Sequence, residues 1–248
     1  MVIDKEYYQM IFKRKSFRKF NDTLKLSQDE LRDIDEKVKD LIPLIDTIDV
    51  KYRIVRREET TCKRGEYCLL IYSEEKERFL LNIGYMFEQL DLYLANKDIG
   101  VCWYGMGKTQ VSEYENLKFV IMMALGKGQP HEFRRDYTKC KRKETQEIWQ
   151  GISGLEIVAE VVKYAPSACN TQPWRVVCEK NKLKVYRTTH VKSIMPKDKV
   201  SFYNSIDIGI FLYFLELALL YNHISFQRFL CVKEDKVELI PIAVYDLL

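Results

Sequence analysis

The chain has 248 residues, of which 47% are hydrophobic, so it is long enough to bury a sizeable core. Its 40 basic and 36 acidic residues nearly cancel, which argues against nucleic acid or a membrane surface as a partner and leaves room only for a local anion site. Seven cysteines without regular spacing and three histidines indicate reduced thiols and no metal site. The N-terminus carries charges before any apolar run, which argues against a secretory signal and favours a cytoplasmic location.

The first predicted element is a helix over residues 4–13, which runs into the basic segment "FKRKSFRKF", residues 12–20. Five cations surround a hydroxyl here; they are Lys13, Arg14, Lys15, Arg18 and Lys19, around Ser16. Guanidinium forks and a hydroxyl are the donors that a phosphate needs, and such a group would lie near the surface. A solvated basic turn explains the same residues.

The next elements are a helix over 27–44, with Ser27 and Glu30 as a capping box, and strands over 51–57, 67–73 and 119–126. Between the last two strands lie an apolar helix and the stretch "GVCWYGMGK", residues 100–108. Gly105 and Gly107 would let backbone N–H groups approach a planar ligand, although a helix cap and turn needs glycines too. No strand is predicted before them, so they do not form a dinucleotide-binding fingerprint.

Two apolar helices resemble each other at an offset of 125 residues, 82–100 and 207–225, with Gly84 on Gly209 and Asp91 on Glu216. Each is followed by a β-type run, 119–126 and 237–245. The pattern suggests a duplication; one domain with two similar core helices is the alternative. The second run, 206–221, is shorter than the roughly 20 residues of a membrane span and reads as a buried core helix.

Residues 128–150 are polar and basic, and they are predicted to link a first half, 1–127, to a second half, 151–248. The second half is predicted to contain a helix over 156–165 and strands over 175–180, 182–188 and 238–245. Helices and strands do not alternate as βαβ units, so the fold class is α+β.

The second half opens with the loop "YAPSACNTQPWR", residues 164–175. Prolines fix its backbone, small residues admit a flat surface and amides offer paired donors and acceptors; these are Pro166, Ser167, Ala168, Asn170, Gln172 and Pro173. Such a loop suits an aromatic heterocycle with polar edges. Trp174 leads into a strand and is predicted to lie in the core.

These motifs together resemble the FMN-dependent nitroreductase family. "RKSFRKF" is similar to its R-R-S-x-R-x-F signature, and "APSACNTQPW" to its P-S-x-x-N-x-Q-P-W loop, which is the more specific match. "KDIGVCWYGMG" and the basic "RKETQEI" from Arg142 resemble two further family features. Together the four cover both halves of the chain.

Their order departs from the family pattern, because the signature opens one half and the loop opens the other. The resemblance therefore implies the single-chain TM nitroreductase branch, in which two degenerate halves imitate the family homodimer around central buried helices. Such a pseudo-dimer would be a monomer. It would hold one FMN, because "IPLIDT" and "IWQGISGL" stand where a second site needs a loop and an arginine signature.

The resemblance also implies the site. The phosphate and polar tail of FMN would contact Arg14, Lys15, Ser16, Arg18 and Arg142. Backbone groups of Gly105, Met106 and Gly107 would line the pyrimidine and N5 side. The ring system would lie against Pro166, Ser167, Ala168, Asn170 and Gln172. No catalytic side chain and no metal ligand is implied.

The implied activity is an FMN-dependent oxidoreductase. NAD(P)H would pass hydride to flavin N5, and a small-molecule acceptor of nitroaromatic, quinone or flavin type would then be reduced. The alternative is a flavin-binding storage or sensor protein with little turnover. Neither reading involves nucleic acid or a membrane.

Overall fold

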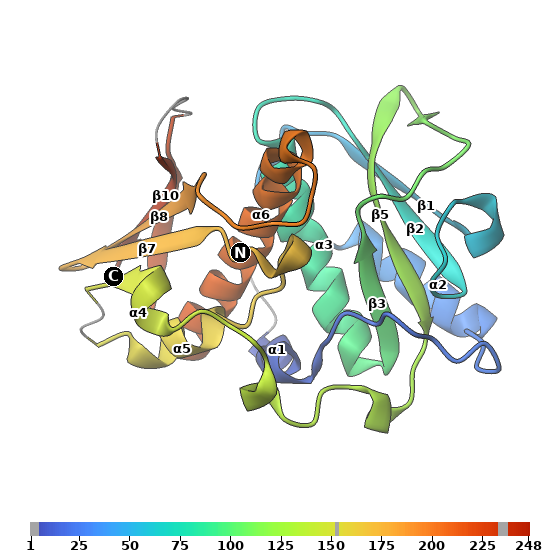
Figure 1. The fold of residues 1–248 in the computed structure, drawn as a ribbon, viewed down its shortest axis with the longest axis horizontal. Coiled ribbons are helices and arrows are strands. Elements are labelled where there is room, and N and C mark those ends of the chain that lie inside the picture. The colour runs from blue at the N-terminus through green and yellow to red at the C-terminus, as the bar shows by residue number, and fades with distance from the viewer. Residues whose placement is uncertain (1–4, 152–153, 233–237) are drawn as a thin grey trace.

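The computed structural model describes residues 5–151, 154–232 and 238–248. Two five-stranded sheets lie on either side of a pair of long helices (Figure 1). This mixed helix-and-sheet content agrees with the predicted α+β class. The predicted helix start at Asp4, the predicted strand start at Val237 and residues 152–153 of "IWQGISGL" lie outside the described residues.

The α-helices differ greatly in length. They are α1 (Met10–Lys13), α2 (Gln28–Lys39), α3 (Phe79–Asn96), α4 (Thr145–Ile148), α5 (Glu156–Val162) and α6 (Lys197–Tyr221). Short 3₁₀ helices occupy Lys5–Gln9, Arg57–Glu59, Pro130–Glu132, Tyr137–Lys139 and Ala168–Asn170. Among the described α-helices, α3 with 18 residues and α6 with 25 residues are the longest, and both are buried along most of their length.

The first sheet comes from residues 50–127 and has the order β1-β2-β5-β3, with β4 attached to β5. Its strands are β1 (Val50–Arg56), β2 (Tyr67–Ser73), β3 (Ile99–Tyr104), β4 (Glu113–Tyr114) and β5 (Leu117–Lys127), and all are antiparallel. β3 was not predicted. It runs directly into Gly105, so the statement that no strand precedes the glycines is wrong.

The helix before β3 is shorter than the apolar pattern indicates. α3 ends at Asn96, and Asp98 then takes a left-handed φ of 55°, which turns the chain back along the sheet. Residues 99–102 are buried as a continuous apolar run, which periodicity alone does not separate from the end of a helix.

The second sheet comes from residues 149–247 and has the order β6-β7-β8-β10-β9. Its strands are β6 (Trp149–Gln150), β7 (Trp174–Glu179), β8 (Lys182–Thr188), β9 (Phe226–Leu230) and β10 (Leu239–Leu247), with β6 parallel to β7 and the other pairs antiparallel. β9 was not predicted. Because α4 and β6 lie within 128–150, the second sheet begins inside the predicted linker.

The capping box predicted for α2 is present. Ser27 Oγ accepts from the N–H of Glu30 at 3.1 Å, and the Glu30 carboxylate accepts from the N–H of Ser27 at 2.9 Å. The helix ends at Lys39 and does not reach Leu44. Pro43 explains the early end, because a proline disfavours helical geometry at the residue before it.

The contact between α3 and α6 depends on two glycines. A Cβ on Gly84 would lie 2.0 Å from the carbonyl oxygen of Ile206, and a Cβ on Gly209 would lie 2.0 Å from that of Leu81. The two contacts are reciprocal, since both pairs of positions are separated by 125 residues in the sequence. The helices therefore approach so closely that no side chain fits between them at these points.

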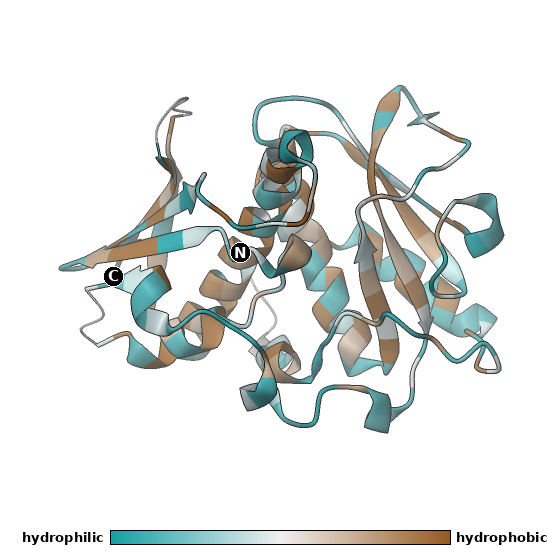
Figure 2. Ribbon diagram, in the orientation of Figure 1, coloured by the Kyte–Doolittle hydropathy of each residue, from teal (hydrophilic) through white to brown (hydrophobic). Residues whose placement is uncertain are grey.

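α6 begins after Pro196 and is longer than the run predicted from its apolar residues. By length and composition it could cross a membrane, but 83% of its most apolar window is buried inside the protein. Brown, apolar residues cover the two central helices and their facing strands in Figure 2, while teal residues dominate the loops. The burial of α6 therefore identifies it as a core helix, because its length alone would allow it to span a membrane.

Candidate functional site

The basic segment follows α1 and lies along β3, the edge strand of the first sheet. The N–H of Phe17 donates to the carbonyl of Val101 at 2.8 Å, and its ring is buried with only 2% exposed. Ser16 and Arg18 flank this anchor in an extended chain, in which side chains alternate in direction. Phe17 therefore fixes where its two polar neighbours lie.

The proline loop, residues 166–173, is held from both sides. Three of its residues adopt left-handed φ angles of 51°, 57° and 48°, at Cys169, Asn170 and Gln172. Ser167 Oγ accepts from the N–H of Gln172 at 3.0 Å. The N–H of Ala168 donates to both carboxylate oxygens of Asp207 on α6, at 3.0 and 3.1 Å. The loop is thus attached to the central helix.

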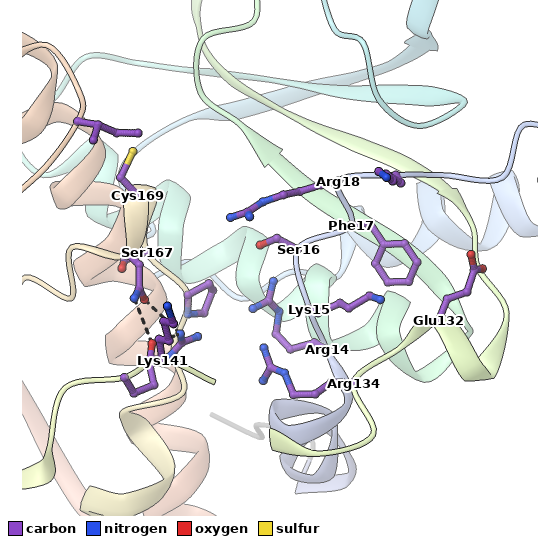
Figure 3. Close-up of a pocket in the computed structure, with 15 residues that line it drawn as sticks. Arg14, Lys15, Ser16, Phe17, Arg18, Glu132, Arg134, Lys141, Ser167 and Cys169 are labelled. Atoms are coloured by element: carbon purple, nitrogen blue, oxygen red, sulfur yellow. Dashed lines mark hydrogen bonds between the residues drawn. The ribbon is translucent and has the colours of Figure 1, made fainter. Parts of the chain in front are cut away.

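Two cavities lie between the basic segment and the proline loop. The basic cavity has a volume of about 910 Å³, and Figure 3 shows Ser16 and Arg18 on one side of it and Ser167 and Cys169 on the other. The apolar cavity has a volume of about 410 Å³ and extends to β3 and the start of α6. They share the lining residues Ser16, Arg18, Pro166, Ser167 and Cys169. An elongated ligand could therefore occupy both.

Cations dominate the wall of the basic cavity. They are Arg14, Lys15, Arg18, Lys19, Arg134, Lys141 and Arg142, and among the described lining residues Glu132 is the one acid. Burial and the charge of Arg14 lower the pKa of Arg134 to about 10. Nη1 of Arg134 and Nε of Arg142 are buried without a hydrogen-bond partner among the described residues. Crowded cations with unused donors suit a dianionic ligand such as phosphate.

Arg14 is not the surface cation that the sequence suggested. Only 2% of it is exposed, and its Nη2 lies 3.0 Å from Oδ2 of Asp91 and its Nε 3.7 Å from Oε1 of Glu88, both on α3. Burial lowers the pKa of Arg14, but the two carboxylates outweigh it and the net shift is upward. The guanidinium therefore contributes to the core as well as to the cavity wall.

Lys15 also differs from the expectation. Its Nζ lies 4.9 Å from the centre of the Phe17 ring, and Figure 3 shows the side chain directed away from Ser167. Ser16 and Arg18 line both cavities. The residues predicted to bind phosphate thus lie along one wall of the basic cavity, but their side chains do not all face the proline loop.

The two glycines after β3 serve different contacts. Gly105 and Met106 line the apolar cavity, whereas Gly107 does not. Gly107 packs against Met122 instead, and a Cβ added to it would lie 2.7 Å from the Met122 sulfur. At Gly105 a Cβ would lie 2.6 Å from the ring of Tyr203, whose hydroxyl donates to the Gly105 carbonyl. Gly105 thus admits an aromatic ring from α6 in this structure.

Arg142, Asn170 and Gln172 join the linker to the proline loop. Arg142 Nη1 donates to Asn170 Oδ1 at 3.1 Å, and Asn170 Nδ2 donates to the carbonyl of Lys141 at 3.1 Å. Gln172 Oε1 accepts from the N–H of Lys143 at 2.8 Å. Gln172 is buried and lines neither cavity, and its amide joins the proline loop to the linker in this structure.

Several lining residues were missed in the sequence. Arg134 and Lys141 lie in the predicted linker, whose basic composition was the available signal. Arg64, Tyr203 and Asp207 reach the apolar cavity from segments with no local motif. Asp207 is 4% exposed, and burial raises its pKa to about 8. Trp174 is fully buried and stacks on Phe211 at 4.9 Å, as its predicted core position requires.

Comparison with known proteins defines the class to which this fold belongs. A putative nitroreductase from Thermotoga maritima MSB8 superposes with a TM-score of 0.63 at 18% identity, over 97% of this chain and 92% of that one. A nitroreductase family protein from Clostridium difficile 630 covers 60% of this chain and 97% of its own, with a TM-score of 0.45 and 10% identity. The fold is nitroreductase-like.

The family itself follows from the sequence match. The family model described as "Putative TM nitroreductase" matches residues 6–219, which is most of the chain. This protein belongs to that family, and the resemblance seen in its motifs is confirmed. Comparison with curated proteins finds no match. Membership in a nitroreductase family makes it an oxidoreductase by class.

Proposed function

We propose that this protein is an FMN-dependent NAD(P)H oxidoreductase. The observation that carries the proposal is the pair of joined cavities, one basic and one apolar, between the basic segment and the proline loop. Their combined character matches a ligand with a phosphate at one end and an aromatic ring system at the other. FMN has this form.

The residues of the two cavities fit such a ligand. Arg134 and Arg142 each have a buried donor with no partner in the part of the chain that the structure describes, and with Ser16 and Arg18 they would hold the phosphate and polar tail. Pro166, Ser167 and Ala168 would lie against the ring together with Gly105 and Met106. Arg14 would act mainly by fixing the wall from which these donors project, because Asp91 and Glu88 already engage it.

The duplication is part of the proposal: residues 1–127 and 151–248 would be degenerate halves of one pseudo-dimer, joined by 128–150. Two reciprocal features support it. Gly84 and Gly209 make equivalent contacts across α3 and α6. Asn82 accepts from the N–H of Leu44 at 2.8 Å, just as Asp207, 125 residues later, accepts from that of Ala168. Each long helix thus holds the loop of its own half.

When bound, FMN would supply reversible hydride chemistry between a nicotinamide donor and a small-molecule acceptor. The chain's own contribution is to neutralise the phosphate, to exclude water from the ring and to leave one face open to reactants. Tyr203 and Trp103 form part of the apolar cavity wall and set its shape. A nitroaromatic, quinone or flavin would fit this chemistry as acceptor.

The test has two stages. FMN is titrated into the flavin-free chain, and the loaded protein is then mixed with NADH or NADPH in a stopped-flow spectrometer. Binding near one FMN per chain followed by bleaching within seconds supports the proposed enzyme. Binding without bleaching over many minutes indicates a storage or sensor protein, and absence of binding contradicts the cofactor assignment.

A further inference from the structure

We propose that Asp207 is a proton donor of the apolar cavity and delivers a proton to the bound electron acceptor. This inference rests on the proposed oxidoreductase function and adds a residue role to it. Asp207 lies on α6, lines the apolar cavity, and is 96% removed from solvent, with 4% exposed. It is a titratable group placed where a reacting molecule would lie.

The first argument is the absence of a counter-charge among the described residues. Burial is the largest influence on Asp207 and raises its pKa to about 8, while hydrogen bonds from Ala168 and Thr171 lower it only partly. The ionisable groups around it are Glu88 on α3 and, in the cavity wall, Arg18, Arg64, Cys102, Tyr104, Cys169 and Tyr203. No cation is among the influences that set the pKa of Asp207. A buried carboxyl without a counter-ion keeps its proton.

The second argument is an internal control within the chain. Asn82, 125 residues earlier, holds the loop of the first half through one amide oxygen, which accepts from the N–H groups of Leu44 and Ile45 at 2.8 and 3.0 Å. Holding a loop on the central helices therefore needs an oxygen acceptor but no acid. A carboxyl is present only on the side where the cavity lies. Loop attachment alone does not explain it.

The chemistry balances as follows. A quinone-type acceptor becomes a hydroquinone by gaining one hydride equivalent, which originates in the nicotinamide donor, and one proton. Asp207 supplies that proton from its carboxyl oxygen and becomes a carboxylate. The N–H of Ala168, which already lies 3.0 Å from one oxygen and 3.1 Å from the other, stabilises the new charge. Solvent entering after product release restores the proton.

The first measurement needs no cofactor. Thermal unfolding of the flavin-free chain is compared with that of Asp207→Asn between about pH 5 and pH 8. Because burial raises the pKa of Asp207 in the folded chain, the unfolded chain loses this proton at a lower pH than the folded chain does. The free energy of unfolding therefore falls as pH rises through this range, and the wild-type Tm should fall relative to that of Asp207→Asn. Glu88 titrates in both proteins and largely cancels from the difference. A difference that does not change with pH would overturn the proposal.

The second measurement follows oxidation of the NADH-reduced, FMN-loaded protein by 1,4-benzoquinone across the same pH range. The wild-type rate should fall as pH rises through the pKa of Asp207, and Asp207→Asn should be slower by about 10²–10⁴-fold with a flat pH profile. The matched control is Asn82→Asp, which places an acid at the equivalent position away from the cavity and should leave the rate unchanged. An Asp207→Asn protein with the wild-type rate and pH profile would overturn the proposal.

The two measurements separate this proposal from the function on which it rests. A chain that binds no FMN contradicts the oxidoreductase assignment, while the unfolding comparison still reports whether Asp207 holds its proton. A chain that binds FMN and turns over normally, but shows no pH-dependent difference in Tm, contradicts the proton donor alone.

Discussion

At the scale of single residues, Arg14 shows how burial changes the meaning of a motif. Its position in "RKSFRKF" suggests an exposed phosphate ligand, yet it lies within the core between two acids of α3. Burial raises the pKa of both acids, that of Glu88 well above its usual range, and the charge of Arg14 opposes the rise; the carboxylate of Asp91 lies nearer to Arg14, at 3.0 Å. Arg14 and Asp91 thus form a buried ion pair in which each side chain compensates the charge of the other.

We therefore expect Arg14→Ala to destabilise the protein by about 3–5 kcal/mol, since it leaves Asp91 as an uncompensated buried charge. Urea unfolding of the flavin-free chain measures this. The control is Lys15→Ala, whose side chain has no carboxylate partner within 4 Å among the described residues and should change stability little. If Arg14→Ala were as stable as the wild type, the structural role of Arg14 would be contradicted and only ligand binding would remain as its function.

Arg134 is the opposite case, a cation in a predicted linker whose Nη1 is buried with no partner within the described ranges. We expect Arg134→Ala to weaken FMN binding by about 1.5–3 kcal/mol, roughly tenfold to a hundredfold, because a charge-assisted contact to phosphate is lost. The flavin-free chain should keep its stability, as repulsion from Arg14 is also relieved. Fluorescence titration with FMN measures the affinity. The neighbouring Arg135→Ala, at an exposed position, is the matched control.

At the scale of elements, α3 and α6 approach each other so closely that backbone meets backbone. The contact is made by backbone at Gly84 and Gly209, so the spacing of the two sheets and the width of the cavities between them depend on it. The apolar cavity takes its wall from both sides of this junction, from β3 and from the first turns of α6.

We expect Gly84→Ala and Gly209→Ala each to cost at least about 1–3 kcal/mol, because a methyl group 2.0 Å from a carbonyl oxygen forces the helices apart. The double variant should cost less than the sum, since the first substitution already separates the helices. Denaturant unfolding of the four proteins gives the coupling. Lys199→Ala, exposed on α6, should lie within about 0.5 kcal/mol of wild type. Strict additivity would mean that the two contacts are independent.

At the scale of the whole molecule, segments far apart in the sequence meet at the two cavities. The basic segment comes from residues before the first sheet, and the proline loop from the start of the second. Their meeting requires α3 and α6 to pack inside one chain, as they do here (Figure 1).

We expect the FMN-loaded protein to behave in solution as a 29.6 kDa monomer with one flavin. In the proposed pseudo-dimer, the second position would have "IWQGISGL" in place of the basic segment, and a phosphate without its cations loses its main attraction. Light scattering with flavin absorbance measures both quantities in one run. Flavin found only in a dimer fraction, or two flavins per chain, would contradict the pseudo-dimer.

Local patterns in the sequence were sufficient for the features that depend on neighbouring residues. The capping box at Ser27, most of the strands and the motif match to the family all arise within short windows, where propensity and hydrogen bonding are decided locally. The two apolar helices could be recognised as core helices because their composition is apolar on nearly every side. β3 was missed because a short apolar run directly after a helix has no distinguishing period, whereas β9 was missed although its five residues alternate between half-buried and exposed.

Only the tertiary structure decided which polar groups are buried together. Asp91 and Glu88 reach Arg14 across more than 70 residues of sequence, and Tyr203 covers Gly105 from the other half of the chain. The pKa of Asp207 depends on the walls packed around it, which no window near residue 207 contains. Desolvation and charge pairing act through space, and so the roles of these residues follow from the packing of α3 against α6 and not from the motifs in which they occur.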